Sequence, residues 1–236
     1  GFMKIFIYLL ALFALSTAHA NNIIVNGTRF IYSEDSAEIT IQMTNTGNYP
    51  SLAQVWLDEG NPEKLPEEIS TPFIISPPIA RVDAGNGQSL RIKKAVDKNI
   101  VATDRESMWW LNILDIPSVD KNSVTDNSAV LNLAIRSRFK FFWRPSGLGD
   151  RQNAENKIKI IANQRDITLV NPTPFFITVA DIVTSSGHGL INEVVMVAPK
   201  SRTTINAKQQ VSQGESVVLQ AISDYGGIVE HKTTIN

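Results

Sequence analysis

Side chains able to carry out acid–base or nucleophilic chemistry are scarce in this 236-residue chain. After the first twenty residues the histidines are His188, which stands between two glycines as in a solvated turn, and His231. The adjacent carboxylates Glu67 and Glu68 lie in a polar stretch, which solvation explains better than glycoside hydrolysis. The chain has no cysteine and no serine-nucleophile, zinc-helix or phosphate-loop motif. We therefore expect no enzyme, no catalytic residue, no metal site and no cofactor.

Residues 129–145 indicate a different chemistry, the recognition of another chain. Read at period two, one face of the segment is mainly apolar: Leu131, Leu133, Ile135, Ser137, Phe139, Phe141 and Trp143. The other face is mainly basic: Asn132, Ala134, Arg136, Arg138, Lys140, Phe142 and Arg144. This alternation predicts a half-buried strand of roughly 55 Å, whereas ordinary strands have about 5–6 residues. Its surplus length must be covered by something else, and a partner chain is one candidate.

The elements that must position this strand are also strands. Alternating apolar residues, separated by Gly, Pro and Asn clusters, predict strands within 37–47, 51–60, 88–94, 108–116, 157–161, 166–171, 174–183, 193–198 and 215–223. After the first twenty residues no segment keeps a helical spacing of apolar residues over three turns. Short strands at near-regular spacing predict an all-β fold of the sandwich type.

Residues 1–20 are typical of a cleavable signal peptide. Lys4 precedes an apolar run from Ile5 to Leu15, and Ala18-His19-Ala20 forms a small-x-small cleavage site before Asn21. The alternative, a membrane-spanning helix, would need about 20 apolar residues, which this run does not reach. The two residues ahead of Met3 receive no role. We therefore expect an exported protein without membrane insertion.

The exported part divides near a glycine-rich segment. Residues 146–150 hold two glycines and follow a proline, so they are predicted to be a hinge between domains 21–145 and 151–236. Hydrophobic residues make up 43% of the chain, enough for cores that do without disulfides. The net charge of −1 gives no general attraction for nucleic acid or an anionic membrane.

Five motifs give the chain a resemblance to the PapD-like family of periplasmic pilus chaperones. They are residues 27–32 (GTRFIY), 104–117 (DRES running into LNILDIP), 134–145 (AIRSRFK running into RP), 171–174 (NPTP) and 224–227 (DYGG). Their order and spacing extend over nearly all of residues 21–236. The resemblance implies two immunoglobulin-like β-sandwich domains set at an angle, L-shaped or like a boomerang.

The resemblance also implies a binding site. Arg29 and Lys140 align with two basic residues that anchor the C-terminal carboxylate of a pilus subunit, a role that suits the fork of arginine and the point charge of lysine. Without the motifs, an ordinary surface ion pair and a solvated lysine would explain both residues. Leu131, Leu133 and Ile135 align with the residues that fill the groove of a subunit lacking its final strand. Their alternative role is in the core of their own domain.

Three more residues align with a family feature at the domain junction. Glu106, Arg144 and Asp224 correspond to an ionic cluster that would hold the angle between the domains without binding a ligand. Ser76-Pro77 matches a position that favours a cis bond. The connection from Pro117 to about Ala129 is short and lacks a flanking cysteine pair, which indicates the short-loop type of the family.

The function expected from the resemblance is that of a periplasmic chaperone. It would bind fimbrial subunits by donor-strand complementation, prevent their premature polymerisation and deliver them to an outer-membrane usher. A long apolar edge also invites self-pairing, so we expect a weak self-capping homodimer of the free protein. The alternative is a secreted two-domain adhesin or carbohydrate-binding module, for which no cluster of aromatic residues stands out.

Overall fold

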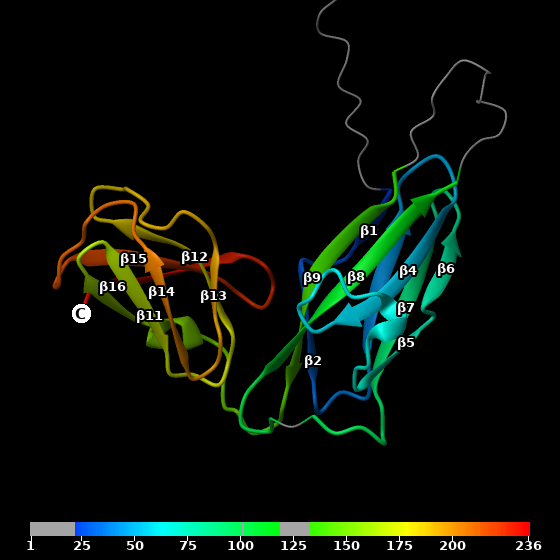
Figure 1. Cartoon of the computed structure of the whole chain (residues 1–236), viewed down its shortest axis with the longest axis horizontal. Coiled ribbons are helices and arrows are strands. Elements are labelled where there is room, and N and C mark those ends of the chain that lie inside the picture. The colour runs from blue at the N-terminus through cyan, green and yellow to red at the C-terminus, as the bar shows by residue number, and fades with distance from the viewer. Residues whose placement is uncertain (1–21, 101, 119–132) are drawn as a thin grey trace, which may run out of the picture.

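The computed structural model describes residues 22–100, 102–118 and 133–236, which form two β-sandwiches that meet at an angle (Figure 1). Each sandwich buries a separate cluster of apolar side chains. The predicted all-β fold of two immunoglobulin-like sandwiches is therefore confirmed. Within these ranges no helix is long and apolar enough to cross a membrane.

The first sandwich packs a four-stranded sheet, β1-β3-β7-β5, on a five-stranded sheet, β2-β9-β8-β4-β6. Its strands are β1 (Ile23–Val25), β2 (Arg29–Ser33), β3 (Ile39–Asn45), β4 (Ser51–Asp58), β5 (Phe73–Ser76), β6 (Ile79–Val82), β7 (Gly87–Lys94), β8 (Ser107–Pro117) and β9 (Ile135–Arg144), with a short 3-10 helix η2 (Pro66–Glu68). Alternate residues such as Trp109, Leu111 and Ile113 on β8 point into the core. Each large apolar side chain buried in this way contributes about 1.5–3 kcal/mol.

Strand β9 has different neighbours along its length. It pairs antiparallel with β8 from Ser107↔Trp143 to Asp115↔Ile135. On its other side, β2 runs parallel to it but pairs only with Lys140–Arg144. No other described strand lies on that side of the first half of β9. The strand begins at Ile135, later than the alternation in the sequence predicts, at the residue where its pairing with β8 also ends.

The second sandwich packs a three-stranded sheet, β10-β11-β14, on a four-stranded sheet, β13-β12-β15-β16. Its elements are the 3-10 helix η3 (Ala154–Lys157) and strands β10 (Lys159–Asn163), β11 (Asp166–Asn171), β12 (Ile177–Thr184), β13 (Val195–Val197), β14 (Ser201–Asn206), β15 (Ser216–Ile222) and β16 (Ile228–Thr234). Its core includes Ile167 and Leu169 of β11 and Leu219 of β15. The Ser76–Pro77 bond in the first sandwich is cis.

Candidate functional site

Arg29 and Lys140 lie side by side at the junction of the two sandwiches. They are register partners in the parallel pair of β2 and β9, and neighbouring strands are about 4.8 Å apart. Lys140 extends to the second sandwich, where its Nζ donates a hydrogen bond to Thr178 Oγ1 at 3.2 Å. The Nε of Arg29 is buried and has no hydrogen-bond partner among the described residues. The fold thus brings together the two residues predicted to bind a carboxylate.

Both cations are held in an unfavourable environment. Burial, and to a smaller extent the charge of Arg29, lowers the pKa of Lys140 to about 8. Burial also lowers the pKa of Arg29, although Asp224 acts in the opposite direction. An anion entering between the two side chains would favour their charged forms and relieve this penalty. A carboxylate is a suitable anion because the arginine fork can bind both of its oxygens.

The predicted donor residues lie at the start of β9 or ahead of it. Ile135 is half-buried and is the first residue of the strand. Leu133 precedes the strand and is 57% exposed, unlike the core residues of this domain. Leu131 lies outside the described residues. The structure therefore places Ile135 at the part of β9 that β2 does not cover, with Leu133 two residues ahead of it.

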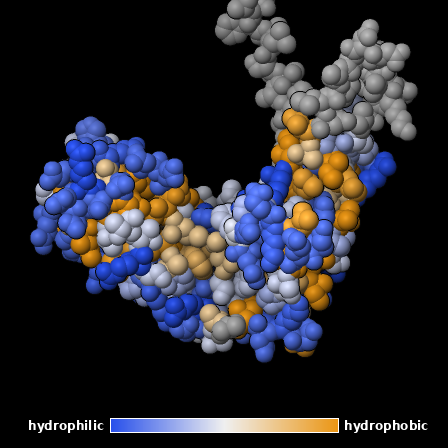
Figure 2. Space-filling view, viewed as in Figure 1, coloured by the Kyte–Doolittle hydropathy of each residue, from blue (hydrophilic) through white to orange (hydrophobic). Residues whose placement is uncertain are grey.

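A cavity of about 240 Å³ lies between β1 and the first half of β9. Its lining includes Ile23 and Val25 of β1, Ile113 of β8 and Phe139 of β9. Figure 2 shows apolar residues gathered on the half of the first sandwich that points away from the domain junction. An apolar opening thus adjoins the strand edge that carries Ile135.

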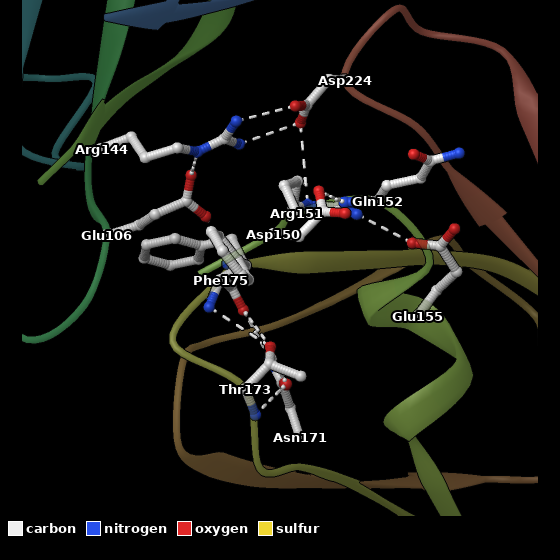
Figure 3. A network of polar contacts seen from close by, with 11 residues as sticks. Glu106, Arg144, Asp150, Arg151, Gln152, Glu155, Asn171, Thr173, Phe175 and Asp224 are labelled. Atoms are coloured by element: carbon white, nitrogen blue, oxygen red, sulfur yellow. Dashed lines mark hydrogen bonds and ion pairs between the residues drawn. The ribbon is translucent and has the colours of Figure 1, made fainter. Parts of the chain in front are cut away.

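Glu106, Arg144 and Asp224 form a chain of ion pairs across the domain junction (Figure 3). Arg144 donates from Nε to Glu106 Oε2 at 2.8 Å and from its two terminal nitrogens to Asp224 at 2.8 and 3.0 Å. The side chain of Glu106 is only 1% exposed, whereas that of Asp224 is 28% exposed. Burial raises the pKa of Glu106, against the attraction of Arg144. The structure brings the three predicted residues together.

Glu106 also makes two hydrogen bonds to the backbone of the second domain. Its Oε1 accepts a hydrogen bond from the Phe176 amide at 2.8 Å, and its own amide donates to the Pro174 carbonyl at 2.9 Å. Arg144 lies over the ring of Phe175, 5.3 Å from the centroid. The cluster therefore connects the ends of β8 and β9 to the segment before β12.

Phe142 departs from the pattern of its strand. Its parity puts it on the basic face, yet it is buried and its ring lies 5.5 Å from that of Phe176. The second sandwich covers this part of the outer face, so an apolar residue is favourable there. A single phenylalanine on the basic face of the strand was the signal in the sequence that another part of the protein covers this position.

A second polar network on the outer face of the first sandwich escaped the sequence reasoning. The carboxylate of Asp58, 1% exposed, accepts hydrogen bonds from Arg138 at 2.7 and 2.9 Å and from Asn112 at 2.6 Å. Burial acts to raise the pKa of Asp58, but these hydrogen bonds outweigh it and lower the pKa. The guanidiniums of Arg136 and Arg138 lie over two tryptophans. The network consists of Trp56, Asp58, Trp110, Asn112, Arg136 and Arg138.

The fold is that of two immunoglobulin-like domains, and comparison with known proteins identifies it as that of a fimbrial chaperone. The family of pili and flagellar-assembly chaperones matches with its PapD N-terminal domain over residues 22–149 and with its PapD C-terminal domain over residues 153–233. The chain therefore belongs to the PapD-like family of fimbrial chaperones. The domain limits and hinge drawn from the sequence remain predictions.

Three relatives illustrate the likeness. The chaperone protein MrkB of Klebsiella pneumoniae is 50% identical over 218 residues, which cover 92% of this chain and 93% of that protein. The structure of the CupB2 chaperone of Pseudomonas aeruginosa superposes with a TM-score of 0.75 at 33% identity, covering 90% of this chain and 100% of CupB2. That of the YadV chaperone, from Escherichia coli, gives 0.74 at 30% identity, covering 91% and 100%. None of these likenesses supports the adhesin alternative.

Proposed function

We propose that this chain binds fimbrial subunits in the periplasm, prevents their premature polymerisation and delivers them to an outer-membrane usher. The observation that carries the proposal is the composition of β9. One strand bears a basic residue at the junction, Lys140, and an apolar residue, Ile135, at an edge that no described strand covers. Such an arrangement can anchor the end of a chain and pair with it at the same time.

The carboxylate of the subunit is proposed to bind between Arg29 and Lys140. Arg29 would use its planar fork and Lys140 its point charge. Two observations support this assignment. The buried Nε of Arg29 lacks a described partner, and an anion would accept its hydrogen bond. The pKa of Lys140 is lowered, and an anion would favour its charged form.

The strand edge is proposed to complete the subunit. Backbone groups of β9 would pair with a strand of the subunit, while the side chains of Leu131, Leu133 and Ile135 fill the groove left by its missing strand. The 57% exposure of Leu133 supports a partner role, since a residue of the domain's own core would be buried. This mode needs no nucleotide and no catalytic residue.

Residues 1–20 are proposed to act as a signal peptide that directs export and is cleaved after Ala20. In the absence of a subunit, the edge of β9 is proposed to pair weakly with that of a second copy. Self-pairing would keep the apolar edge away from water and from wrong partners until a subunit arrives.

Co-expression with a fimbrial subunit tests the function directly. We expect a one-to-one complex to be recovered from the periplasm, and the subunit alone to be degraded or aggregated. The control is a subunit that lacks its C-terminal residues, which should not be retained. Recovery of equal amounts of both subunits would contradict the carboxylate anchor, and recovery of neither would contradict the chaperone function.

A further inference from the structure

Tyr225 is an aromatic residue at the domain junction that the proposed function does not use. It belongs to the DYGG motif at residues 224–227, in which Asp224 binds Arg144. Tyr225 is 98% exposed. Its ring therefore makes almost no contact within its own chain and is available to another one. Tyrosine is enriched in binding sites because its ring offers a large contact area and its hydroxyl a hydrogen bond.

The turn that carries this tyrosine is held against the first sandwich. Residues 223–227 connect β15 to β16 and extend toward the first sandwich (Figure 1), and two backbone hydrogen bonds of 2.8 and 2.9 Å close the turn. Gly226 has a φ of +82° and lies so close to Thr28 that a side chain there would collide with the threonine hydroxyl. On the other side of the tyrosine, Asp224 is bound by Arg144. The backbone of the tyrosine is thus fixed by contacts of both its neighbours.

A small cavity lies between this turn and the start of β2. Its volume is about 230 Å³, and its lining is mainly polar. Tyr225 and Asp224 line it from the second sandwich, and Arg29, Thr28 and Thr40 line it from the first. Pockets for small molecules usually have about 300–1,000 Å³, so this cavity is better suited to a single side chain. Because Arg29 and Asp224 carry opposite charges, the cavity favours an uncharged polar group that both donates and accepts hydrogen bonds.

The proposed carboxylate anchor would bring the end of a bound chain to this cavity. The carbon of a terminal carboxylate is one bond, about 1.5 Å, from the Cα of the last residue. Arg29 takes part both in the proposed anchor and in the lining of the cavity. A carboxylate held by Arg29 therefore leaves the side chain of the last residue next to the cavity.

We propose that this cavity binds the side chain of the C-terminal residue of the subunit, and that it selects an uncharged polar side chain such as that of glutamine. The inference rests on the proposed function, because Arg29 must hold the carboxylate. The amide group forms hydrogen bonds inside the cavity, and the ring of Tyr225 covers the methylene groups as an outer wall. Tyr225 is thus a specificity-determining residue that the second sandwich supplies, although the donor strand belongs to the first.

Synthetic peptides test the cavity. Each peptide matches the 10 residues of β9 in length, alternates valine with serine and carries a fluorophore at its N-terminus. The last residue is glutamine, glycine or leucine, and each peptide is made as the free acid and as the C-terminal amide. Binding to the purified protein is measured by fluorescence anisotropy. We expect the wild type to bind the acid that ends in glutamine about tenfold more tightly than the acids that end in glycine or leucine.

Variants of Tyr225 assign this preference to the ring. Tyr225→Ala should bind the three acids with equal affinity, whereas Tyr225→Phe, which keeps the ring, should retain the preference for glutamine. Both should fold like the wild type, because a residue that is 98% exposed adds little to the core. Tyr49→Ala removes a tyrosine that is 50% exposed and does not line the cavity. It is the matched control and should behave like the wild type.

The acids and the amides separate this inference from the proposed function. If an acid and its amide bind equally, or if neither binds, the carboxylate anchor is wrong and the inference fails with it. If the acids bind more tightly than the amides, the anchor stands and only the cavity is in question. Equal affinities of the wild type for the three acids, tightest binding of the leucine acid, or an unchanged preference in Tyr225→Ala would then each overturn the assignment of the cavity.

Discussion

Lys140 is a half-buried cation that forms no ion pair with a described carboxylate. Burial lowers its pKa to about 8, and its hydrogen-bond partner is the neutral hydroxyl of Thr178. A lysine used for stability would be paired or solvated. At the residue scale, these features support the proposal that the site binds an anion from another molecule.

Removing either member of the basic pair separates binding from folding. We expect Lys140→Ala and Arg29→Ala to keep thermal midpoints within about 2 °C of the wild type, since each loses a charge that burial penalises. Each should abolish recovery of the subunit, because the desolvated carboxylate loses its partner. Lys64→Ala, at an exposed position, is the control for co-purification. Normal amounts of complex in either variant would disprove the anchor.

The pKa of Lys140 predicts how subunit affinity depends on pH. A bound carboxylate favours the ammonium form and raises the pKa of Lys140 above its free value of about 8. Affinity should therefore be full below pH 8 and fall as the pH rises through 8. The complex is titrated between pH 6 and 10 by calorimetry, with Lys140→Arg as a variant that stays charged. An unchanged affinity of the wild type across this range would contradict the prediction.

The same shift has the opposite sign for the stability of the free protein. The folded pKa of Lys140 lies below the usual value, so the unfolded chain binds more protons between pH 8 and about 10.4. The contribution of this residue to the free energy of unfolding should rise over that window. Urea titrations of the wild type and of Lys140→Ala at pH 7.5 and 10 measure the difference.

At the scale of elements, the sequence predicted strands best where side chains form the core. Residues 166–171 coincide with β11, and β8 extends only one residue beyond each end of the predicted 108–116. The strands β1, β2, β5, β6, β14 and β16 were missed. β16 is an edge strand, in which Val229 packs against the core. The strand is otherwise held by backbone pairing with β15. Pairing of that kind leaves little periodicity in the sequence.

The candidate site was predictable only in part, because the contacts that form it depend on the tertiary structure and leave no local pattern in the sequence. Arg29 and Lys140 are 111 positions apart, and the family motifs rather than any spacing put them together. The network around Asp58 needs the register of three strands, which period-two alternation does not give. The contact of Phe142 with Phe176 needs the position of the second domain.

A substitution at Leu133 distinguishes a donor strand, which binds a partner, from a strand that packs in the core of its own domain. We expect Leu133→Glu to keep its thermal midpoint, because the side chain is 57% exposed and the new charge stays in water. It should lose subunit capture and shift any dimer towards monomer. Circular dichroism melting and analytical ultracentrifugation measure these effects. Leu111→Glu, in the centre of the core, is the contrasting variant and should unfold. A collapsed melting transition of Leu133→Glu would remove the central residue of the donor strand.

At the scale of the whole molecule, the angle between the domains depends on a few contacts. Arg144 binds two carboxylates, Glu106 directly before β8 and Asp224 in the loop before β16. Lys200 adds an exposed ion pair with Asp104 at 3.1 Å. The buried cluster is not evidence of high stability, because desolvation can cancel its Coulomb attraction. We infer that its role is to fix the domain junction at which Arg29 and Lys140 lie.

Removing the central cation tests this inference. Arg144→Ala leaves the buried carboxylate of Glu106 without its arginine, and we expect a loss of about 3–5 kcal/mol in the free energy of unfolding. The variant should also be degraded in the periplasm before a binding defect can be scored. Urea unfolding measures the loss. Arg105→Ala, which removes an exposed ion pair, should leave the midpoint unchanged. A wild-type midpoint for Arg144→Ala would show that the cluster is dispensable.

Under the proposed function, the arrangement of β9 would let the molecule measure the length of a bound segment. Lys140 and Ile135 are five residues apart on one extended strand, so they are about 17 Å apart and face opposite sides. A subunit whose carboxylate is held at Lys140 must present its groove at that fixed distance. If the C-terminal segment of the subunit that pairs with β9 were one residue longer or shorter, it would present the wrong face to β9 at every position. Under the proposed function, the chaperone would thus select subunits by the length of their C-terminal segment, a property that no single contact encodes.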